Sequence, residues 1–168
     1  AAFDIGVSVS NYDTLFLSGA DITHSDEDYA PKLYKDVQDN PTSLICTTMS
    51  SHRNPDRHFY GADILFKITE DDLAEDSPLR SKGKHRSILE GKWRPKTGDG
   101  IYPLPSLMGA FYGVTKEWYH HVQGFNMHSK WGSLEPYISL KSWLLGGKVL
   151  IDTDIDVLHK SHRTGFAR

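Results

Sequence analysis

Residues 106–122 read SLMGAFYGVTKEWYHHV, and this stretch decides the fold of the chain. The run of small and apolar residues at its start predicts a buried strand over residues 106–114. Thr115 follows directly, and its hydroxyl can cap a short helix that extends to Val122. Gly124 then ends this helix. A buried strand that leads straight into a helix is typical of an α/β domain.

The upstream half of the chain alternates helices and strands in the same way. Short apolar or β-branched runs predict the strands, and Ser25 followed by three acidic residues predicts a helix start. The expected elements are a helix over residues 1–11, a strand over 14–17, a helix from Ser25 to about Asn40, and strands over 43–49 and 62–67.

Between residues 79 and 105 the hydrophobic periodicity disappears. This stretch is rich in Lys, Arg, Gly and Pro, so we interpret it as one long loop. Its cations, Arg86 among them, could bind a donor pyrophosphate or a phosphate-rich polymer, or could simply be solvated. Trp93 stands between two cations and makes a binding role for the loop more attractive.

Downstream, a helix is predicted from Pro136 to Leu145, because proline suits a first helical position and Gly146-Gly147 follow the last one. Leu134, Ile138 and Leu145 fall near one face of this helix, with Tyr137, Leu140 and Leu144 widening it. We expect that face to pack against the sheet. A last strand is expected over residues 148–151.

Composition limits the classes of function. The chain has 168 residues, 38% of them hydrophobic, so we expect a single domain over residues 1–168. A formal net charge of −3 gives no overall attraction to nucleic acid or anionic membranes. Because no apolar run approaches about 20 residues, we expect no membrane span in this chain. The single cysteine, Cys46, excludes an internal disulfide and favours a reducing, cytoplasmic location.

Several short motifs follow one another in the order seen in GT-A glycosyltransferases. The chain resembles the polypeptide N-acetylgalactosaminyltransferases and the family 2 transferases in particular. The motifs are the apolar strand after Gly109, the turn Gly124-Phe125-Asn126, the helix start with Trp131-Gly132 and Glu135, and the late Val157-Leu158-His159.

The resemblance implies an α/β, GT-A-like mixed sheet flanked by helices. It also implies metal-assisted transfer of a sugar from a nucleotide-sugar donor, such as a UDP-sugar, to a hydroxyl of a glycan, a protein or a modified nucleic acid. The family's nucleotide-binding βαβ segment would precede Ala1. The alternative from another class is a non-catalytic GT-A-derived module that binds glycan, protein or nucleic acid.

A metal site is implied at two strand ends. Asp21 matches the last acidic residue of the family's Asp-x-Asp element, and His159 follows the late strand, so Mn²⁺ or Mg²⁺ would bind between them. We expect the Asp21 loop and the His159 tail to meet at one edge of the sheet. His24 is a third candidate ligand, and His162 is a rival of His159. Without the family pattern, Asp21 would be a turn residue and His24 a polar residue near a helix start.

Glu135 is the candidate catalytic residue. The family places an acidic side chain near this point, where it could accept the proton of the acceptor hydroxyl, although Glu135 could also simply cap its helix. For the donor we expect Arg86 at the pyrophosphate, Trp131 at the sugar and Gly109 at the strand beside it.

Overall fold

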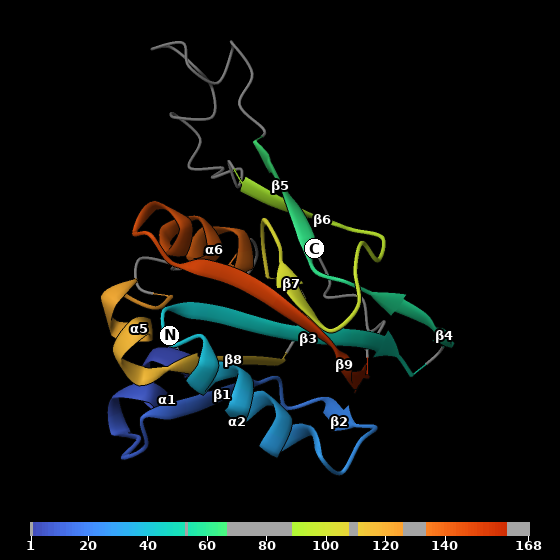
Figure 1. Ribbon diagram of the computed structural model, residues 1–168, viewed down its shortest axis with the longest axis horizontal. Helices are drawn as coiled ribbons and strands as arrows, with labels where there is room; N and C mark the ends of the chain where they lie inside the picture. Colours follow the sequence, from blue (N-terminus) through green and yellow to red (C-terminus); the bar gives the residue numbers. More distant parts are fainter. Residues whose placement is uncertain (1, 53, 67–88, 108–110, 126–133, 161–168) are drawn as a thin grey trace, which may run out of the picture.

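The computed structural model describes residues 2–52, 54–66, 89–107, 111–125 and 134–160. One mixed sheet forms the middle of this part of the chain, with helices on both of its faces (Figure 1). The strands lie in the order β1-β8-β3-β9-β2, with β4 beside the end of β3 and β7 beside β9. β3 and β9 run parallel, whereas the other pairs in the sheet are antiparallel. β5 and β6 form a separate hairpin.

Helices and strands are mixed along the chain, but their order is less regular than expected, because among the described elements β3 to β8 follow one another between α2 and α5. The helices are α1 (Ala2–Val9), α2 (Tyr29–Asp39), α5 (Lys116–His121) and α6 (Leu134–Leu144). The strands are β1 (Thr14–Ser18), β2 (Ile22–His24), β3 (Ser43–Ser51), β4 (Asn54–Phe59), β5 (Ala62–Phe66), β6 (Leu89–Trp93), β7 (Ile101–Pro103), β8 (Phe111–Thr115) and β9 (Lys148–His159). Within the described residues, no helix is long and apolar enough to cross a membrane.

Each face of the sheet has its own apolar core. On one face, α1, α5 and α6 cover alternate residues of the central strands, including Cys46 and Ile151. On the other face, Leu33 and Val37 of α2 pack over Ile45. The helix approaches closely because β8 has no side chain at Gly113, where a Cβ would stand 2.8 Å from atoms of both α2 residues. A larger residue there would push α2 off the sheet.

The strand-to-helix turn that decides the fold forms as predicted. Thr115 Oγ1 accepts a hydrogen bond from Trp118 N over 3.1 Å and caps α5. The described part of the strand is β8, from Phe111 to Thr115, and Ser106, expected at its start, pairs with Ala62 of β5 instead. Residues 108–110 lie outside the described part.

Two upstream expectations are wrong. Ser25 does not cap a helix, because its hydroxyl donates to the Asp156 carbonyl over 2.6 Å, and α2 begins at Tyr29. The expected loop over residues 79–105 contains two strands, β6 and β7, in its described part. Their pairing with β5 and β9 stabilises them, and pairing partners leave no mark in local periodicity.

The buried face of α6 also differs from the expected one. The helix begins at Leu134, and its buried residues are Pro136, Ile138, Ser139 and Ser142. Leu144 and Leu145, expected in the core, are 76% and 48% exposed. Two serines are buried on this face because each hydrogen-bonds to a backbone group. Ser139 Oγ accepts from Leu107 N over 2.9 Å, and Ser142 Oγ donates to Lys148 O over 3.1 Å.

Candidate metal and catalytic site

Asp21 and His159 meet at one edge of the sheet. Ile22 pairs with His159 in the antiparallel β2–β9 ladder, and Lys160 N donates to the Asp21 carbonyl over 2.9 Å. These two constraints place His159 Nε2 3.1 Å from Asp21 Oδ2. Both side chains are partly exposed, at 28% and 37%. The sheet therefore brings together the carboxylate and the imidazole that the sequence placed at two strand ends.

His24 belongs to an aromatic stack. Its ring lies parallel to that of Tyr29 with centroids 3.5 Å apart, and it meets the Phe111 ring edge-on at 4.7 Å. Burial lowers the pKa of His24, which favours a neutral imidazole. Nδ1 is buried, and no described residue hydrogen-bonds to it. Within the described ranges, no group of three or more His, Cys, Asp or Glu side chains could hold a metal, so His24 does not complete a cluster with Asp21 and His159.

Glu135 lies in the first turn of α6, where it is largely buried. Tyr112 of β8 donates its hydroxyl hydrogen bond to Glu135 Oε1 over 3.0 Å. Burial raises the pKa of the Glu135 carboxyl, and the bond from Tyr112 partly opposes this rise. The pKa of Tyr112 is raised well above its ordinary value, chiefly by burial, so the hydroxyl keeps its proton and remains a donor.

The Tyr112–Glu135 pair and the metal candidate lie on opposite faces of the sheet. Tyr112 packs in the core beneath α6, whereas Val157, two residues before His159, packs in the core beneath α2. The predicted donor-binding residues Arg86, Gly109 and Trp131, and the rival ligand His162, lie outside the described residues.

The structure adds a polar cluster that the sequence interpretation missed. Ser50 Oγ lies 2.9 and 3.0 Å from the two carboxylate oxygens of Asp156 and 2.8 Å from His58 Nδ1. The Ser50 hydroxyl has one proton, which it can donate either to Asp156 or to His58 Nδ1. The Asp156 carboxylate can only accept a hydrogen bond. If Ser50 donates to Asp156, its oxygen accepts from His58 Nδ1. His58 and Asp156 fall beyond the strands expected from the sequence, so no pattern pointed to them.

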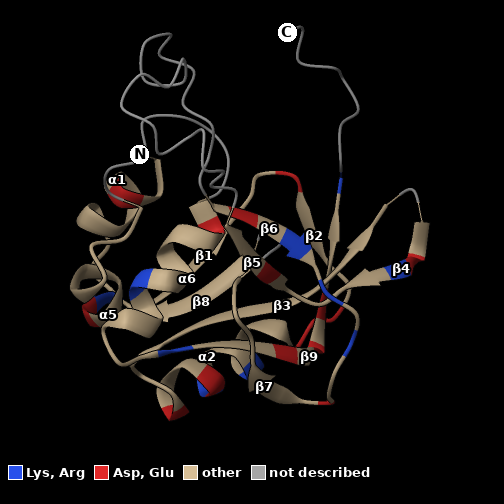
Figure 2. Cartoon of the chain, turned by 90° about the horizontal axis from the view of Figure 1, so that it is seen from above, with Lys and Arg blue, Asp and Glu red and all other residues tan. Residues whose placement is uncertain are grey.

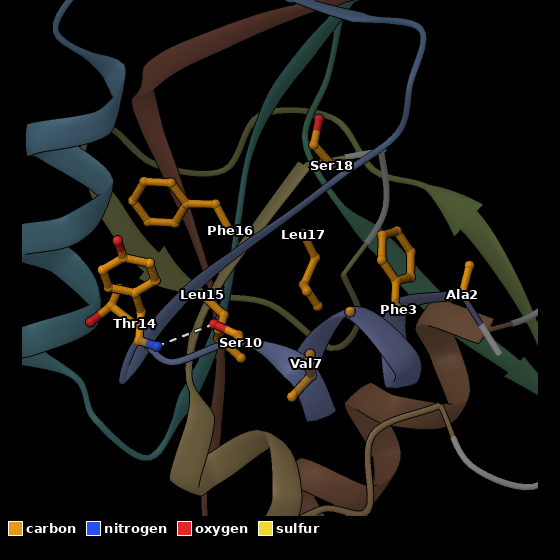
Figure 3. Close-up of a pocket in the computed structure, with 11 residues that line it drawn as sticks. Ala2, Phe3, Val7, Ser10, Thr14, Leu15, Phe16, Leu17 and Ser18 are labelled. Atoms are coloured by element: carbon orange, nitrogen blue, oxygen red, sulfur yellow. Dashed lines mark hydrogen bonds between the residues drawn. The ribbon is translucent and has the colours of Figure 1, made fainter.

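A hollow opens between α1 and β1, and Phe3, Val7 and Leu17 are among the residues that line it (Figure 3). Its described lining comes from residues 2–18 and includes none of the predicted site residues. The hollow therefore does not mark the candidate metal and catalytic site.

No protein-family model matches the chain, and no curated protein matches its sequence. Among solved structures, the fold is similar to that of GalNAc-T7, whose crystal structure contains UDP, GalNAc and Mn²⁺. The TM-score is 0.64 at 17% sequence identity, and the match covers 98% of this chain but 30% of GalNAc-T7. The chain thus spans less than a third of that protein's length. The likeness confirms the expected fold, a mixed sheet flanked by helices of the GT-A glycosyltransferase type.

Proposed function

We propose that this protein transfers a sugar from a nucleotide-sugar donor to an acceptor hydroxyl, with a divalent metal ion held by Asp21 and His159. The observation that carries the proposal is the contact between these two side chains in a GT-A-type fold. They are 138 residues apart in the sequence, and the β2–β9 pairing brings them to the same edge of the sheet, because Asp21 directly precedes β2 and His159 ends β9.

The chemistry of the donor set fits such an ion. One carboxylate with one imidazole suits Mn²⁺ better than Mg²⁺, which prefers oxygen ligands alone. Both side chains are partly exposed, which leaves room for water and phosphate oxygens as further ligands. When bound, the ion would supply positive charge to the leaving diphosphate. Arg86 and Gly109 remain our proposals for donor binding, as does Trp131 for the sugar.

Glu135 is proposed as the base that accepts the proton of the acceptor hydroxyl. Burial raises the pKa of its carboxyl, which makes the carboxylate a stronger base than an exposed one. Tyr112 holds Oε1 by a hydrogen bond of 3.0 Å and fixes the direction of the side chain. Oε2 is then the oxygen that would receive the proton.

A second candidate function is a non-catalytic binding module. It is favoured by the lack, within the described part of the chain, of a third acidic or imidazole side chain beside Asp21 and His159. The two functions differ in one measurable property: the enzyme needs a metal-dependent donor site, whereas the module does not.

The test is calorimetric titration of the full-length protein with UDP and with UDP-GalNAc, with and without Mn²⁺. These probes are chosen because GalNAc-T7 was solved with UDP, GalNAc and Mn²⁺. We expect binding that requires Mn²⁺ and that is lost in Asp21→Asn and in His159→Ala. Asp13→Asn is the matched control, because Asp13 is an exposed carboxyl at the opposite end of β1. Mn²⁺-independent binding, or unchanged binding in both variants, would leave the module as the better function.

A further inference from the structure

Three side chains form a partly exposed ledge at the end of the sheet, which we call the Trp93 ledge: Arg57 and Phe59 of β4 and Trp93 of β6. The ring centroids of Phe59 and Trp93 are 4.5 Å apart, with their planes tilted by 44°. The Arg57 guanidinium carbon lies 5.0 Å from the centroid of the Phe59 ring. Trp93 is 37% exposed, a large fraction for an indole that packs against another ring.

The ledge stands on the same face of the sheet as the candidate metal pair. Phe59 lies opposite Met49, and Met49 lies opposite Val157, so the three side chains share one face. His159, two residues beyond Val157, shares that face as well and contacts Asp21. β3 alone separates β4 from β9, which corresponds to two interstrand spacings or roughly 10 Å. That separation is on the scale of one or two sugar rings.

The charges around the ledge are balanced. Arg94 is ion-paired with Asp63, and Lys96 is ion-paired with Asp99. Figure 2 shows both cationic and acidic positions on β4 and on β6. Single-stranded nucleic acid binds along a positively charged groove that follows its backbone. The balanced charge favours a neutral ligand with a flat apolar face.

We propose that the Trp93 ledge binds a pyranose ring of a neutral carbohydrate. The C–H groups of such a ring carry partial positive charge and pack on the negative face of an indole. The guanidinium of Arg57, held over Phe59, presents fixed N–H donors to the sugar hydroxyls. The use of this carbohydrate as the acceptor of sugar transfer rests on the proposed function, but its binding does not.

The experiment measures carbohydrate binding directly. The full-length protein is titrated with a panel of oligosaccharides ending in GalNAc, GlcNAc, galactose or glucose, and with a single-stranded DNA oligonucleotide. We expect at least one oligosaccharide to bind, with affinity about tenfold or more weaker in Trp93→Ala and in Arg57→Ala. Trp93→Phe should retain part of the affinity. Near-ultraviolet circular dichroism checks that each variant is folded.

Trp143→Ala is the matched control, since its indole is 38% exposed but belongs to α6 and donates to the Pro105 carbonyl, so it is not part of the ledge. It should bind like the wild type. Asp21→Asn should also keep oligosaccharide binding, so a failure of the transferase proposal leaves the ledge testable. Binding of DNA alone, binding of no oligosaccharide, or equal losses in Trp93→Ala and Trp143→Ala would each overturn the proposal.

Discussion

His159 Nε2 and Asp21 Oδ2 lie 3.1 Å apart, within direct hydrogen-bonding distance across the β2 edge of the sheet. A metal ion binds an imidazole only through a nitrogen lone pair, so ion and proton compete for the same atom. The contact therefore makes metal binding at this edge sensitive to acid.

Mn²⁺ affinity is expected to fall as the pH is lowered, because protons compete with the ion for the ligand atoms. In Asp21→Asn and His159→Ala, we expect most metal-dependent sugar transfer to be lost while the fold is retained. Titration of Mn²⁺ at several pH values, followed by transfer assays, measures both effects. Full transfer activity in folded Asp21→Asn would remove Asp21 from the mechanism.

Glu135→Gln is expected to lower turnover by about 10²–10⁴, with a much smaller effect on donor binding, because a general base acts on the acceptor. Tyr112→Phe makes a sharper test. The Tyr112 hydrogen bond lowers the pKa of Glu135, so removing it should raise this pKa and move the acidic limb of the pH–rate profile to higher pH. An unshifted limb in Tyr112→Phe would show that Glu135 is not the titrating base.

A pair of carboxyl groups, Asp36 of α2 and Asp152 of β9, should make stability depend on pH. Burial and the nearby Asp152 raise the pKa of Asp36 from 3.8 to about 7. The folded chain therefore keeps a proton that the unfolded chain has already lost, and stability falls as the pH rises from about 4 through about 7. Asp36→Asn should remove this decline and raise the melting temperature at pH 8. The exposed Asp39→Asn should not, and equal melting curves for both variants would contradict the account.

Ser139→Ala is expected to lower the free energy of unfolding by about 1–3 kcal/mol. Ser139 is fully buried, and its Oγ accepts the hydrogen bond of Leu107 N, which alanine would leave unsatisfied. The exposed Ser8→Ala, whose hydroxyl donates to Ile5 O at the surface, is the control. Chemical denaturation measures both, and a change below about 0.5 kcal/mol in Ser139→Ala would contradict the proposed structural role.

The sequence predicted the parts of the fold that depend on local chemistry. Thr115 caps α5 because its own hydroxyl reaches the first turn of the helix. The apolar run over β3 forms a buried strand, as its composition predicted. The Ser25 cap does not form because the Ser25 hydroxyl donates its hydrogen bond to a distant carbonyl, that of Asp156. The Asp21–His159 pair could be placed at one edge from the order of the motifs. The cluster around Ser50 depends on strand pairing alone, which local patterns do not encode.

The position of β1 has a practical consequence for anyone who concentrates this chain. Among the described strands β1 ends the sheet, paired only with β8, and Phe16 on it is 36% exposed. Such an edge can template the addition of further strands, which leads to aggregation. Natural edge strands avoid this with charged residues, lysine above all. Phe16→Lys is therefore the substitution we expect to delay precipitation at high concentration, as light scattering would record.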